Sequence, residues 1–361
     1  MSKVKNSITL TERQLYDLEL IANGGFAPLS GFLNKDDYEN VVSDSRLKNG
    51  ELWPIPVVLD VDSEIFASKV GDIIDLKNSR GKKLATLTIE SIFVPDKKVE
   101  AKNVYGTTDI SHFGVDYLFN RTKDTYVGGK ITVTEKPEHA DFAHIRKSPA
   151  ELKKIFVEKG LKSVIAFQTR NPIHRAHFEV ITRSAKKHNA HILIHPAVGP
   201  TKDGDIDYPT RVRSYEKLVA QRLPDATLSL LPIAMRMAGP REALWHAIIR
   251  KNYGATHFII GRDHASPGKD LAGKAFYGLT EAQEFAIQYA REIGIEIVTS
   301  PELVYDESQN EYISPEDAKA VSKIVSISGT EFRRRLREGE EIPGWFSFPE
   351  VIEELSKNKI N

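Results

Sequence analysis

Between about residue 150 and residue 300, short apolar segments alternate with longer amphipathic segments, and this alternation constrains the fold more than any other feature. Short apolar runs predict buried strands, and the 3.6-residue period between them predicts helices. The predicted strands are Ser163–Phe167, His191–His195, Thr227–Leu231, His257–Ile260 and Ile295–Val298. The predicted helices lie near 174–188, 210–222, 240–252 and 281–293. Such β–α units in series predict an α/β fold, an open parallel sheet with helices on both faces.

Cationic residues follow several of these predicted strands. In an open parallel sheet, ligands bind outside the carboxyl ends of the strands. The cations in the loops there are Arg170 after the first strand, Lys202 after the second, Arg236 and Arg241 after the third, and Arg262 after the fourth. We therefore expect an anion-binding site where these loops meet.

The strongest candidate site lies in the segment 167–177, directly after the first predicted strand. A polar turn there leads into a helix, whose free backbone N–H groups and dipole attract anions such as phosphate. Gln168 and Arg170 stand at the strand end, where a guanidinium group suits a tetrahedral oxyanion. His174 and His177 lie on one face of the helix because they are three residues apart. This pattern predicts a phosphate-bearing ligand such as a nucleotide.

Each of these residues also has a purely structural interpretation. A histidine at a helix start is commonly a satisfied structural group, and an arginine at a strand end commonly pairs with a carboxylate. Two histidines could bind a metal with His264 or Asp263, but the neighbouring arginines would repel a cation. The segment Gly261-Arg262-Asp263-His264 is either a turn with an internal ion pair or a place where Asp263 orients His264 or a sugar hydroxyl.

The tail contains a further helix signal, with Ser328 or Thr330 as the N-cap. The start of this helix is a second candidate phosphate contact. The run Arg333, Arg334 and Arg335 is better explained as a solvated helix face than as a site.

The N-terminal part has a different pattern. Thr11 and Gln14 have the spacing of a capping box and predict a helix that ends at Asn23-Gly24-Gly25. Short β-rich runs between Trp53 and Lys97, two of them joined by a hairpin turn at 78–81, predict a small β-barrel-like domain. Such a domain serves either binding or packing, and the sequence leaves its role open.

Composition excludes several classes of protein. The 361 residues are enough for two or three domains, and 50 basic and 50 acidic residues give a formal net charge of +0, which argues against a nucleic-acid or membrane partner. The chain has no cysteine, so disulfides and cysteine zinc sites are excluded, and we predict no protein-bound metal. No apolar run approaches the ~20 residues of a membrane span, and no signal peptide is visible, so we expect a cytoplasmic enzyme.

Motifs of other enzyme classes are missing from the sequence. It contains no G-x-x-x-x-G-K-[ST] loop, which disfavours a P-loop kinase. No G-x-G-x-x-G follows the first strand of the α/β region, which disfavours a dinucleotide dehydrogenase, and no G-x-S-x-G elbow supports a hydrolase.

Taken together, these segments resemble the ATP sulfurylases, or sulfate adenylyltransferases. Gln168-Thr169-Arg170-Asn171-Pro172 with His174-Arg175-Ala176-His177 is similar to the central motif of that family, and Gly261-Arg262-Asp263-His264-Ala265 to its second motif. The segments 235–242, 26–32 and 327–330 also match, so the resemblance runs nearly end to end. It implies a PUA-like N-terminal domain at 1–150, a Rossmann-like HIGH-type nucleotidyltransferase domain at 151–320 and a small C-terminal subdomain at 321–361.

The resemblance also implies a reaction, in which MgATP and sulfate give adenosine 5′-phosphosulfate and pyrophosphate. Gln168, Arg170 and the backbone of Ala265 would hold sulfate. Thr169, Arg170 and Asn171 would be the catalytic set, with His174 and His177 holding the β- and γ-phosphates. The implied ATP-binding residues are Gln168, Thr169, Arg170, Asn171, His174, His177, Gly261, Arg262, Asp263, His264 and Val304.

This assignment is physically coherent, because sulfate is already ionised and needs cations and N–H donors rather than a general base. The resemblance implies a homo-oligomer and a monofunctional enzyme, and without cysteine the chain cannot build the cysteine–histidine zinc site of some family members. Two alternatives remain: another HIGH-type adenylyltransferase with a different anionic nucleophile, and a non-catalytic RNA-binding protein built on the barrel domain, against which the net charge argues. The sequence leaves open the physiological direction, the oligomeric state and the selectivity among sulfate-like anions.

Overall fold

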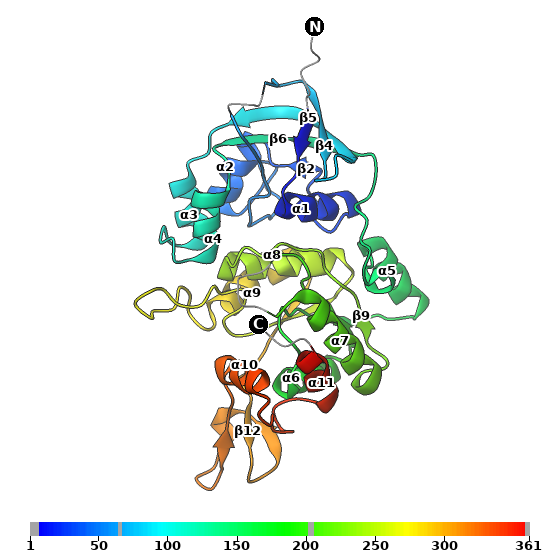
Figure 1. The fold of residues 1–361 in the computed structure, drawn as a ribbon, viewed down its shortest axis with the longest axis vertical. Helices are drawn as coiled ribbons and strands as arrows, with labels where there is room; N and C mark the ends of the chain where they lie inside the picture. The colour runs from blue at the N-terminus through cyan, green and yellow to red at the C-terminus, as the bar shows by residue number, and fades with distance from the viewer. Residues whose placement is uncertain (1–6, 64–66, 201–205, 358–361) are drawn as a thin grey trace.

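The computed structural model of the protein describes residues 7–63, 67–200 and 206–357. Three parts follow one another along the long axis of the molecule (Figure 1). The N-terminal part, blue to cyan, lies at one end, a parallel sheet with its helices lies in the middle, and a small orange sheet lies at the other end. Among the described residues, no helix has both the length and the apolar character needed to cross a bilayer.

The N-terminal part is built on a six-stranded sheet of order β1-β4-β5-β6-β2, with β3 also paired to β6. Its strands are β1 Ser7–Thr9, β2 Gly31–Phe32, β3 Leu59–Val61, β4 Ile73–Lys77, β5 Lys83–Phe93 and β6 Thr125–Val133. The predicted barrel is corrected to an open sheet within the described residues. The reason is that β1 occupies one edge while the short strands β2 and β3 share the other, so the edges do not pair.

Local sequence signals in this part are confirmed. Helix α1 (Glu12–Asn23) has the predicted capping box, in which the Thr11 hydroxyl accepts from the Gln14 N–H and the Thr11 N–H donates to the Gln14 side chain at 2.8 Å. The turn at 78–81 joins β4 and β5, and Gly81 takes the left-handed φ of 76° that such a turn needs. The other helices here are α2 Lys35–Asp44, α3 Lys97–Tyr105, α4 Phe113–Asp116 with a π-helical turn at Tyr117–Arg121, a 3₁₀ turn at Ala143–Ile145 and α5 Pro149–Glu158.

The middle part confirms the predicted α/β fold. Its strands are β7 Val164–Phe167, β8 His191–Ile194, β9 Thr227–Leu228, β10 His257–Ile260 and β11 Glu296–Thr299, and its helices are α6 Arg175–His188, α7 Tyr208–Arg222, α8 Gly239–Asn252 and α9 Glu281–Ile293. All neighbouring strands are parallel, in the order β11-β10-β7-β8-β9. The direction of winding reverses between β7 and β10, and this switch point is where open α/β sheets bind ligands.

Helix α8 separates the sheet from the N-terminal part (Figure 1) and is buried on nearly all sides. Trp245 of α8 packs against Phe26 and Trp53 of the N-terminal part, with ring centroids 5.0 and 6.3 Å apart. A helix covered from both sides has no single apolar face, and the apolar residues of α8 are accordingly spread around it, together with buried polar residues such as Glu242, His246 and Arg250.

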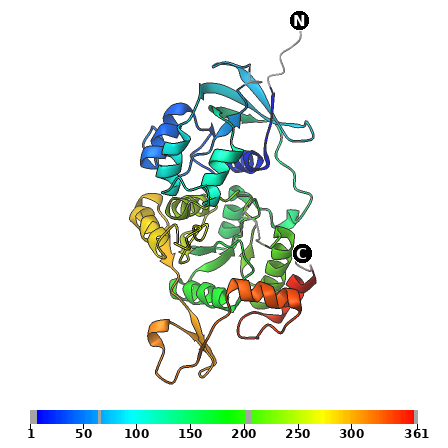
Figure 2. The same ribbon diagram turned by 60° about the vertical axis from the view of Figure 1, so that its left-hand side comes forward.

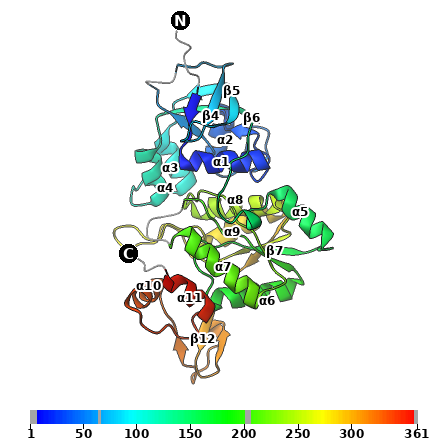
Figure 3. The ribbon, with the colours of Figure 1, turned by 45° about the vertical axis from the view of Figure 1, so that its right-hand side comes forward.

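The C-terminal part has a three-stranded antiparallel sheet of order β13-β12-β14, which projects from the molecule (Figure 2). Its elements are β12 Val304–Asp306, β13 Glu311–Ile313, a 3₁₀ turn at Pro315–Asp317, β14 Ile324–Val325, α10 Gly329–Glu338 and α11 Pro349–Lys357. Helix α11 lies beside α7 (Figure 3), where Arg213 pairs with Glu354 at 2.6 Å. Strand β14 pairs with β12 across the expected boundary at residue 320, and that boundary stays a prediction.

Candidate active site

Two adjoining cavities lie at the carboxyl edge of the parallel sheet, where the sequence predicts a ligand site. The smaller, of about 190 Å³, is lined by residues that follow β7 and β10, among them Gln168 and Ala265. The larger, of about 580 Å³, is lined by the start of α6 and by α10, and its size is typical of a small-molecule site. Arg170, Asn171 and His177 line both cavities, so the cavities meet at the central motif.

The turn after β7 is held by partly buried hydrogen bonds. The Thr169 hydroxyl donates to the Asn171 carbonyl at 2.8 Å and accepts from the Asn171 N–H at 3.0 Å. The Tyr215 hydroxyl donates to the same carbonyl at 2.8 Å, and the Ala197 N–H donates to the Thr169 carbonyl at 3.0 Å. The Thr169 hydroxyl thus makes both of its hydrogen bonds within the turn, and Thr169 thereby fixes the backbone that carries Arg170.

Gln168 has an unsatisfied polar atom in the smaller cavity. Its amide nitrogen contacts the Met235 sulfur at 3.9 Å, and its buried amide oxygen has no hydrogen-bond partner among the described residues. Rotation of the amide by half a turn exchanges its oxygen and nitrogen. Since unpaired buried polar atoms are costly, this side chain is suited to a ligand that accepts a hydrogen bond.

His174 and His177 stand at the start of α6 and line the larger cavity. The His174 N–H donates to Nδ1 of His177 at 3.3 Å, so the proton of a neutral His177 lies on Nε2. Nδ1 of His174 lies 2.9 Å from the Ser347 hydroxyl, and its ring packs against Phe332 and Phe346 with centroids 4.6 Å away. Both imidazoles are therefore held in fixed orientations.

The environment of these two histidines keeps them uncharged. Burial and the neighbouring His177 lower the pKa of His174 to about 3, and burial lowers the pKa of His177 below its usual value. At neutral pH both rings are N–H donors without a positive charge. An anion placed beside them raises their pKa, so their interaction strengthens as negative charge develops nearby.

The second motif forms a strained loop after β10. Asp263 and Ala265 have left-handed φ values of 55° and 54°, a conformation that costs about 1–2 kcal/mol for a residue with a Cβ. The Ala265 carbonyl accepts the N–H of Gly239 at 3.1 Å, which ties the loop to the start of α8. Arg262 pairs with Glu302 at 2.7 Å rather than with its neighbour in the motif. Strain maintained by such contacts is common where backbone groups meet a ligand.

A chain of buried polar groups orients His264 at the wall of the smaller cavity. Its Nε2 lies 3.0 Å from Nδ1 of His246, whose Nε2 lies 3.3 Å from Glu242. Burial opposes the charge on Glu242, but His246 and the N–H groups of Arg236 and Ala238 together lower the pKa of this carboxyl. Burial lowers the pKa of His246 and of His264, so two neutral imidazoles lie in a row beside this carboxylate. Sequence reasoning missed His246, although its spacing of four residues from Glu242 was a usable signal.

The loop after β9 does not supply cations to the site, contrary to the expectation. Arg236 is 3% exposed and donates to both carboxylate oxygens of Asp17 in α1, at 2.7 and 2.6 Å. Arg241 donates to three backbone carbonyls of the N-terminal part. Both side chains reach away from the cavities and fasten the N-terminal part to the sheet. Lys202 lies outside the described residues.

Helix α10 contributes one arginine to the larger cavity. Arg334 and Arg335 both pair with Glu331, as expected for a solvated face. Arg333 instead lines the cavity beside Gly329, so the expectation is corrected for this residue. Ser328 is the N-cap, as predicted, and accepts from the backbone of Glu331 at 3.1 Å.

The structure brings together nearly all residues that the sequence proposed for the site. The residues that line one or both cavities are Gln168, Thr169, Arg170, Asn171, His174, His177, Gly261, Arg262, Asp263, His264 and Ala265. Val304 is the first residue of β12 and lines neither cavity, so its contact with adenine stays a prediction.

Comparison with known families gives a direct result. The ATP-sulfurylase family model matches residues 143–358, and the model of a PUA-like domain matches residues 1–136. The chain belongs to the ATP-sulfurylase family. The resemblance based on the two motifs is thereby confirmed, as is the PUA-like character of the N-terminal part.

Curated relatives of this ATP-sulfurylase chain are named sulfate adenylyltransferase. The protein from Schizosaccharomyces pombe is 53% identical over 96% of this chain and 71% of its own length. Those from Phaeosphaeria nodorum and Eremothecium gossypii are 50% and 51% identical, over 98% and 96% of this chain and 62% and 69% of their own lengths. A solved structure titled hexameric APS kinase from Thiobacillus denitrificans superposes with a TM-score of 0.78 at 29% identity, covering 97% of this chain and 62% of that one.

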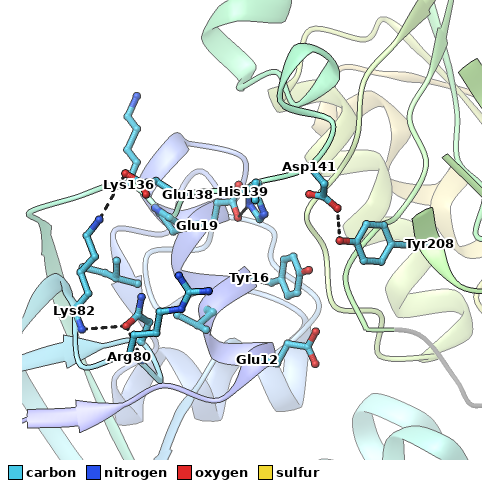
Figure 4. A pocket seen from close by; sticks show the side chains of 15 residues that line it. Glu12, Tyr16, Glu19, Arg80, Lys82, Lys136, Glu138, His139, Asp141 and Tyr208 are labelled. Atoms are coloured by element: carbon cyan, nitrogen blue, oxygen red, sulfur yellow. Dashed lines mark hydrogen bonds and ion pairs between the residues drawn. The ribbon is translucent and has the colours of Figure 1, made fainter. Parts of the chain in front are cut away.

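A larger cavity, of about 860 Å³, lies away from the motifs of this ATP-sulfurylase chain, between α1 and the segment 136–141 (Figure 4). Several polar groups that line it are paired with each other. His139 bonds Glu19 at 2.8 Å, and the Tyr208 hydroxyl donates to Asp141 at its rim. None of the predicted site residues lines this cavity, so its size does not make it the candidate active site.

Proposed function

We propose that this chain is a sulfate adenylyltransferase, which reversibly transfers the adenylyl group of MgATP to sulfate and releases pyrophosphate. The observation that carries the proposal is the meeting of two cavities at Arg170 and His177, at the switch point of the sheet. One cavity suits a small oxyanion, and the other suits a chain of phosphates. The shared name of the curated relatives supports the same reaction.

Sulfate binds in the smaller cavity in this proposal. Arg170 neutralises part of its charge, Gln168 donates its amide N–H, and the backbone of Ala265 adds a further donor. Arg170 stands where both cavities meet, so the same guanidinium can lower the repulsion between sulfate and the α-phosphate.

ATP binds across the junction into the larger cavity. His174 and His177 hold the β- and γ-phosphates at the start of α6, where the helix dipole also attracts anions. Gly261, Arg262, Asp263 and His264 contact the nucleotide, with Val304 near adenine. Mg²⁺ enters as part of the MgATP substrate.

The chemical step is an in-line displacement. A sulfate oxygen attacks the α-phosphorus, the new P–O bond forms, and the bond from the α-phosphorus to the bridging oxygen breaks with pyrophosphate as the leaving group. Sulfate is a dianion at neutral pH, so no general base is needed. The step instead depends on positioning by Thr169, Arg170 and Asn171, and on N–H donors that meet the charge of the departing pyrophosphate.

The experiment that tests this function measures pyrophosphate release from MgATP by the purified chain. Release should require sulfate, or molybdate as a sulfate mimic, and should stop when either is omitted. A panel of other anionic nucleophiles should be inactive. Release at the same rate without sulfate, or activity only with an organic acid or phosphate, would favour a different HIGH-type adenylyltransferase.

Five further properties remain predictions. We propose a homo-oligomer, because the similar solved structure from Thiobacillus denitrificans is titled hexameric. The division at about residues 150 and 320 is proposed from the motifs and awaits a domain-by-domain folding experiment. The monofunctional character and the cytoplasmic location also stay predictions, as does the absence of a nucleic-acid partner.

A further inference from the structure

A second group of chemically active side chains lies at the amino edge of the parallel sheet, opposite the candidate active site. His188 is the last residue of α6, His257 is the first of β10, and Glu296 is the first of β11. His257 and Glu296 are register partners on neighbouring parallel strands, so their side chains share one face of the sheet. The rings of the two histidines have centroids 4.9 Å apart.

The distances in this group match those of a metal site. Nδ1 of His188 lies 3.3 Å from one oxygen of Glu296, and Nε2 of His257 lies 3.1 Å from the other. All three ligand atoms lie within 4.8 Å of one another. A tetrahedral Zn²⁺ with bonds of about 2.0–2.1 Å holds its ligand atoms about 3.3–3.4 Å apart. Because the two histidines contact different oxygens of Glu296, small rotations of the carboxylate and of the rings are needed to bring one atom of each residue to this spacing.

A hydrogen-bond network beside His257 holds its ring toward Glu296. The Thr256 hydroxyl accepts the Val164 N–H at 2.8 Å and donates its single proton to the Val164 carbonyl at 3.1 Å. Nδ1 of His257 lies 2.8 Å from the same hydroxyl, so this contact fixes the orientation of the ring. Nε2 of His257 then faces a carboxylate oxygen of Glu296 at 3.1 Å. An imidazole nitrogen and a carboxylate oxygen at this distance are placed to share a proton or a metal ion.

The surroundings admit a cation from solvent. The side chains of His188 and His257 are 17% and 12% exposed, while that of Glu296 is 57% exposed. The open side leaves room for a water molecule as a fourth ligand. His188 also ends α6, and the carboxyl end of a helix dipole attracts positive charge. The contact between Nδ1 of His257 and the Thr256 hydroxyl fixes the orientation of the ring, as a hydrogen bond to the far nitrogen of a ligating imidazole commonly does.

We propose that His188, His257 and Glu296 bind a divalent transition-metal ion, Zn²⁺ in particular, in a site built without cysteine, which departs from the sequence-based prediction of no protein-bound metal. Two imidazoles and one carboxylate favour zinc or cobalt over Mg²⁺ and Ca²⁺, which prefer oxygen ligands. The ion fastens the end of α6 to the starts of β10 and β11. The opposite ends of α6 and β10 carry His174 and the second motif, so the ion stabilises the frame of the site without touching substrate.

The test measures zinc binding and thermal unfolding of the purified full chain after removal of metal with a chelator. One equivalent of ZnCl₂ should bind, and excess zinc should raise the unfolding temperature by about 3 °C or more. Cobalt chloride should give the visible absorption of a four-coordinate site. His257→Gln should lose the cobalt spectrum and the zinc-induced rise in unfolding temperature.

The matched control is His144→Gln, because His144 pairs with Glu216 at 2.7 Å on the surface and belongs to no three-ligand group within the described part of the chain. This variant should bind zinc as the parent does. Glu296→Gln separates the metal site from a simple ion pair with a protonated imidazole. A metal site requires this variant to lose zinc binding. If the parent binds no zinc, or if both Glu296→Gln and His257→Gln bind it as well as the parent, the proposal is overturned.

Discussion

The loops after β7 and β9 both present arginines at the carboxyl edge of the sheet, yet the two loops use them differently. Arg170, after β7, lines both cavities of the candidate active site. Arg236 and Arg241, after β9, turn away and contact the N-terminal part. A residue that follows a strand of the parallel sheet is therefore predicted to lie at its carboxyl edge. Its place in the sequence does not predict the direction in which a long side chain extends.

The difference has an electrostatic cause. The loop after β9 lies beneath α1, where Asp17 is buried and needs a positive partner, so Arg236 supplies it at 2.6 Å. Burial opposes the charge on Arg236, but Asp17 outweighs it and raises the pKa of the guanidinium. One arginine thus stabilises the docking of two parts of the molecule, while the other is placed to bind substrate. The predictions below test this division.

The largest effect is expected from Asp17→Asn, which leaves the Arg236 charge buried without its carboxylate. Removal of one partner of a buried pair costs about 3–5 kcal/mol of unfolding free energy. Urea unfolding followed by fluorescence measures this loss. The control is Glu292→Gln, which breaks the exposed contact with Arg46 between the same two parts and should cost less than about 1 kcal/mol. Equal losses in the two variants would refute the structural role of the buried pair.

The next effect is expected from Arg170→Ala, which should lower kcat/KM for sulfate about 10²–10³-fold. The reason is that the variant lacks the charge that reduces repulsion between sulfate and the α-phosphate. Its urea unfolding curve should match that of the parent, in contrast to Asp17→Asn. Retention of full activity would remove Arg170 from the sulfate site.

A smaller effect is expected from Arg333→Ala, since this arginine lines the cavity assigned to the phosphates. The KM for MgATP should rise about tenfold, which corresponds to about 1.4 kcal/mol, one hydrogen bond to a charged group. Arg334→Ala is the matched control on the same helix, because Arg334 pairs with Glu331 and Glu340. If both variants raise the KM for MgATP equally, a specific contact between Arg333 and the phosphates is contradicted.

The smallest effect at neutral pH is expected from His174, because its contribution appears only as the pH is lowered. The pKa of His174 is about 3 in the folded chain, against about 6.5 in an unfolded one. Between these values the unfolded chain binds the extra proton, so stability is complete above pH 6.5 and falls as the pH is lowered. His174 contributes up to about 1.4 kcal/mol for each pH unit in this window. His174→Gln should reduce the slope of unfolding free energy against pH by about 1.4 kcal/mol per pH unit, which corresponds to one bound proton. An unchanged slope would contradict the burial of a neutral ring.

Periodicity and local motifs predicted much of the fold. The five strands and four helices of the middle part were expected within a few residues of their observed bounds, because short apolar strands and amphipathic helices have distinct periods. The capping box at Thr11 and the turn at Gly81 depend only on neighbouring residues. The open N-terminal sheet was not predicted, since its closure depends on which distant strands share an edge.

The candidate site was predictable in its motifs but not in its supporting contacts. Two short motifs gave the residues at the junction of the cavities, because strand order brings the ends of β7 and β10 together. The partners of Arg236 and the contact between His246 and His264 depend on tertiary packing between distant segments. Arg333 was missed because the run of three arginines resembles an ordinary solvated face.

The most direct test of the account is a crystal structure of the chain with adenosine 5′-phosphosulfate bound. The sulfate group should lie beside Gln168, Arg170 and the backbone of Ala265, with the phosphate toward His174 and His177. Arg236 should remain paired with Asp17 and away from the ligand. A ligand seated in the cavity between α1 and the segment 136–141, or one contacted by Arg236, would contradict the assignment of the active site to the ends of β7 and β10.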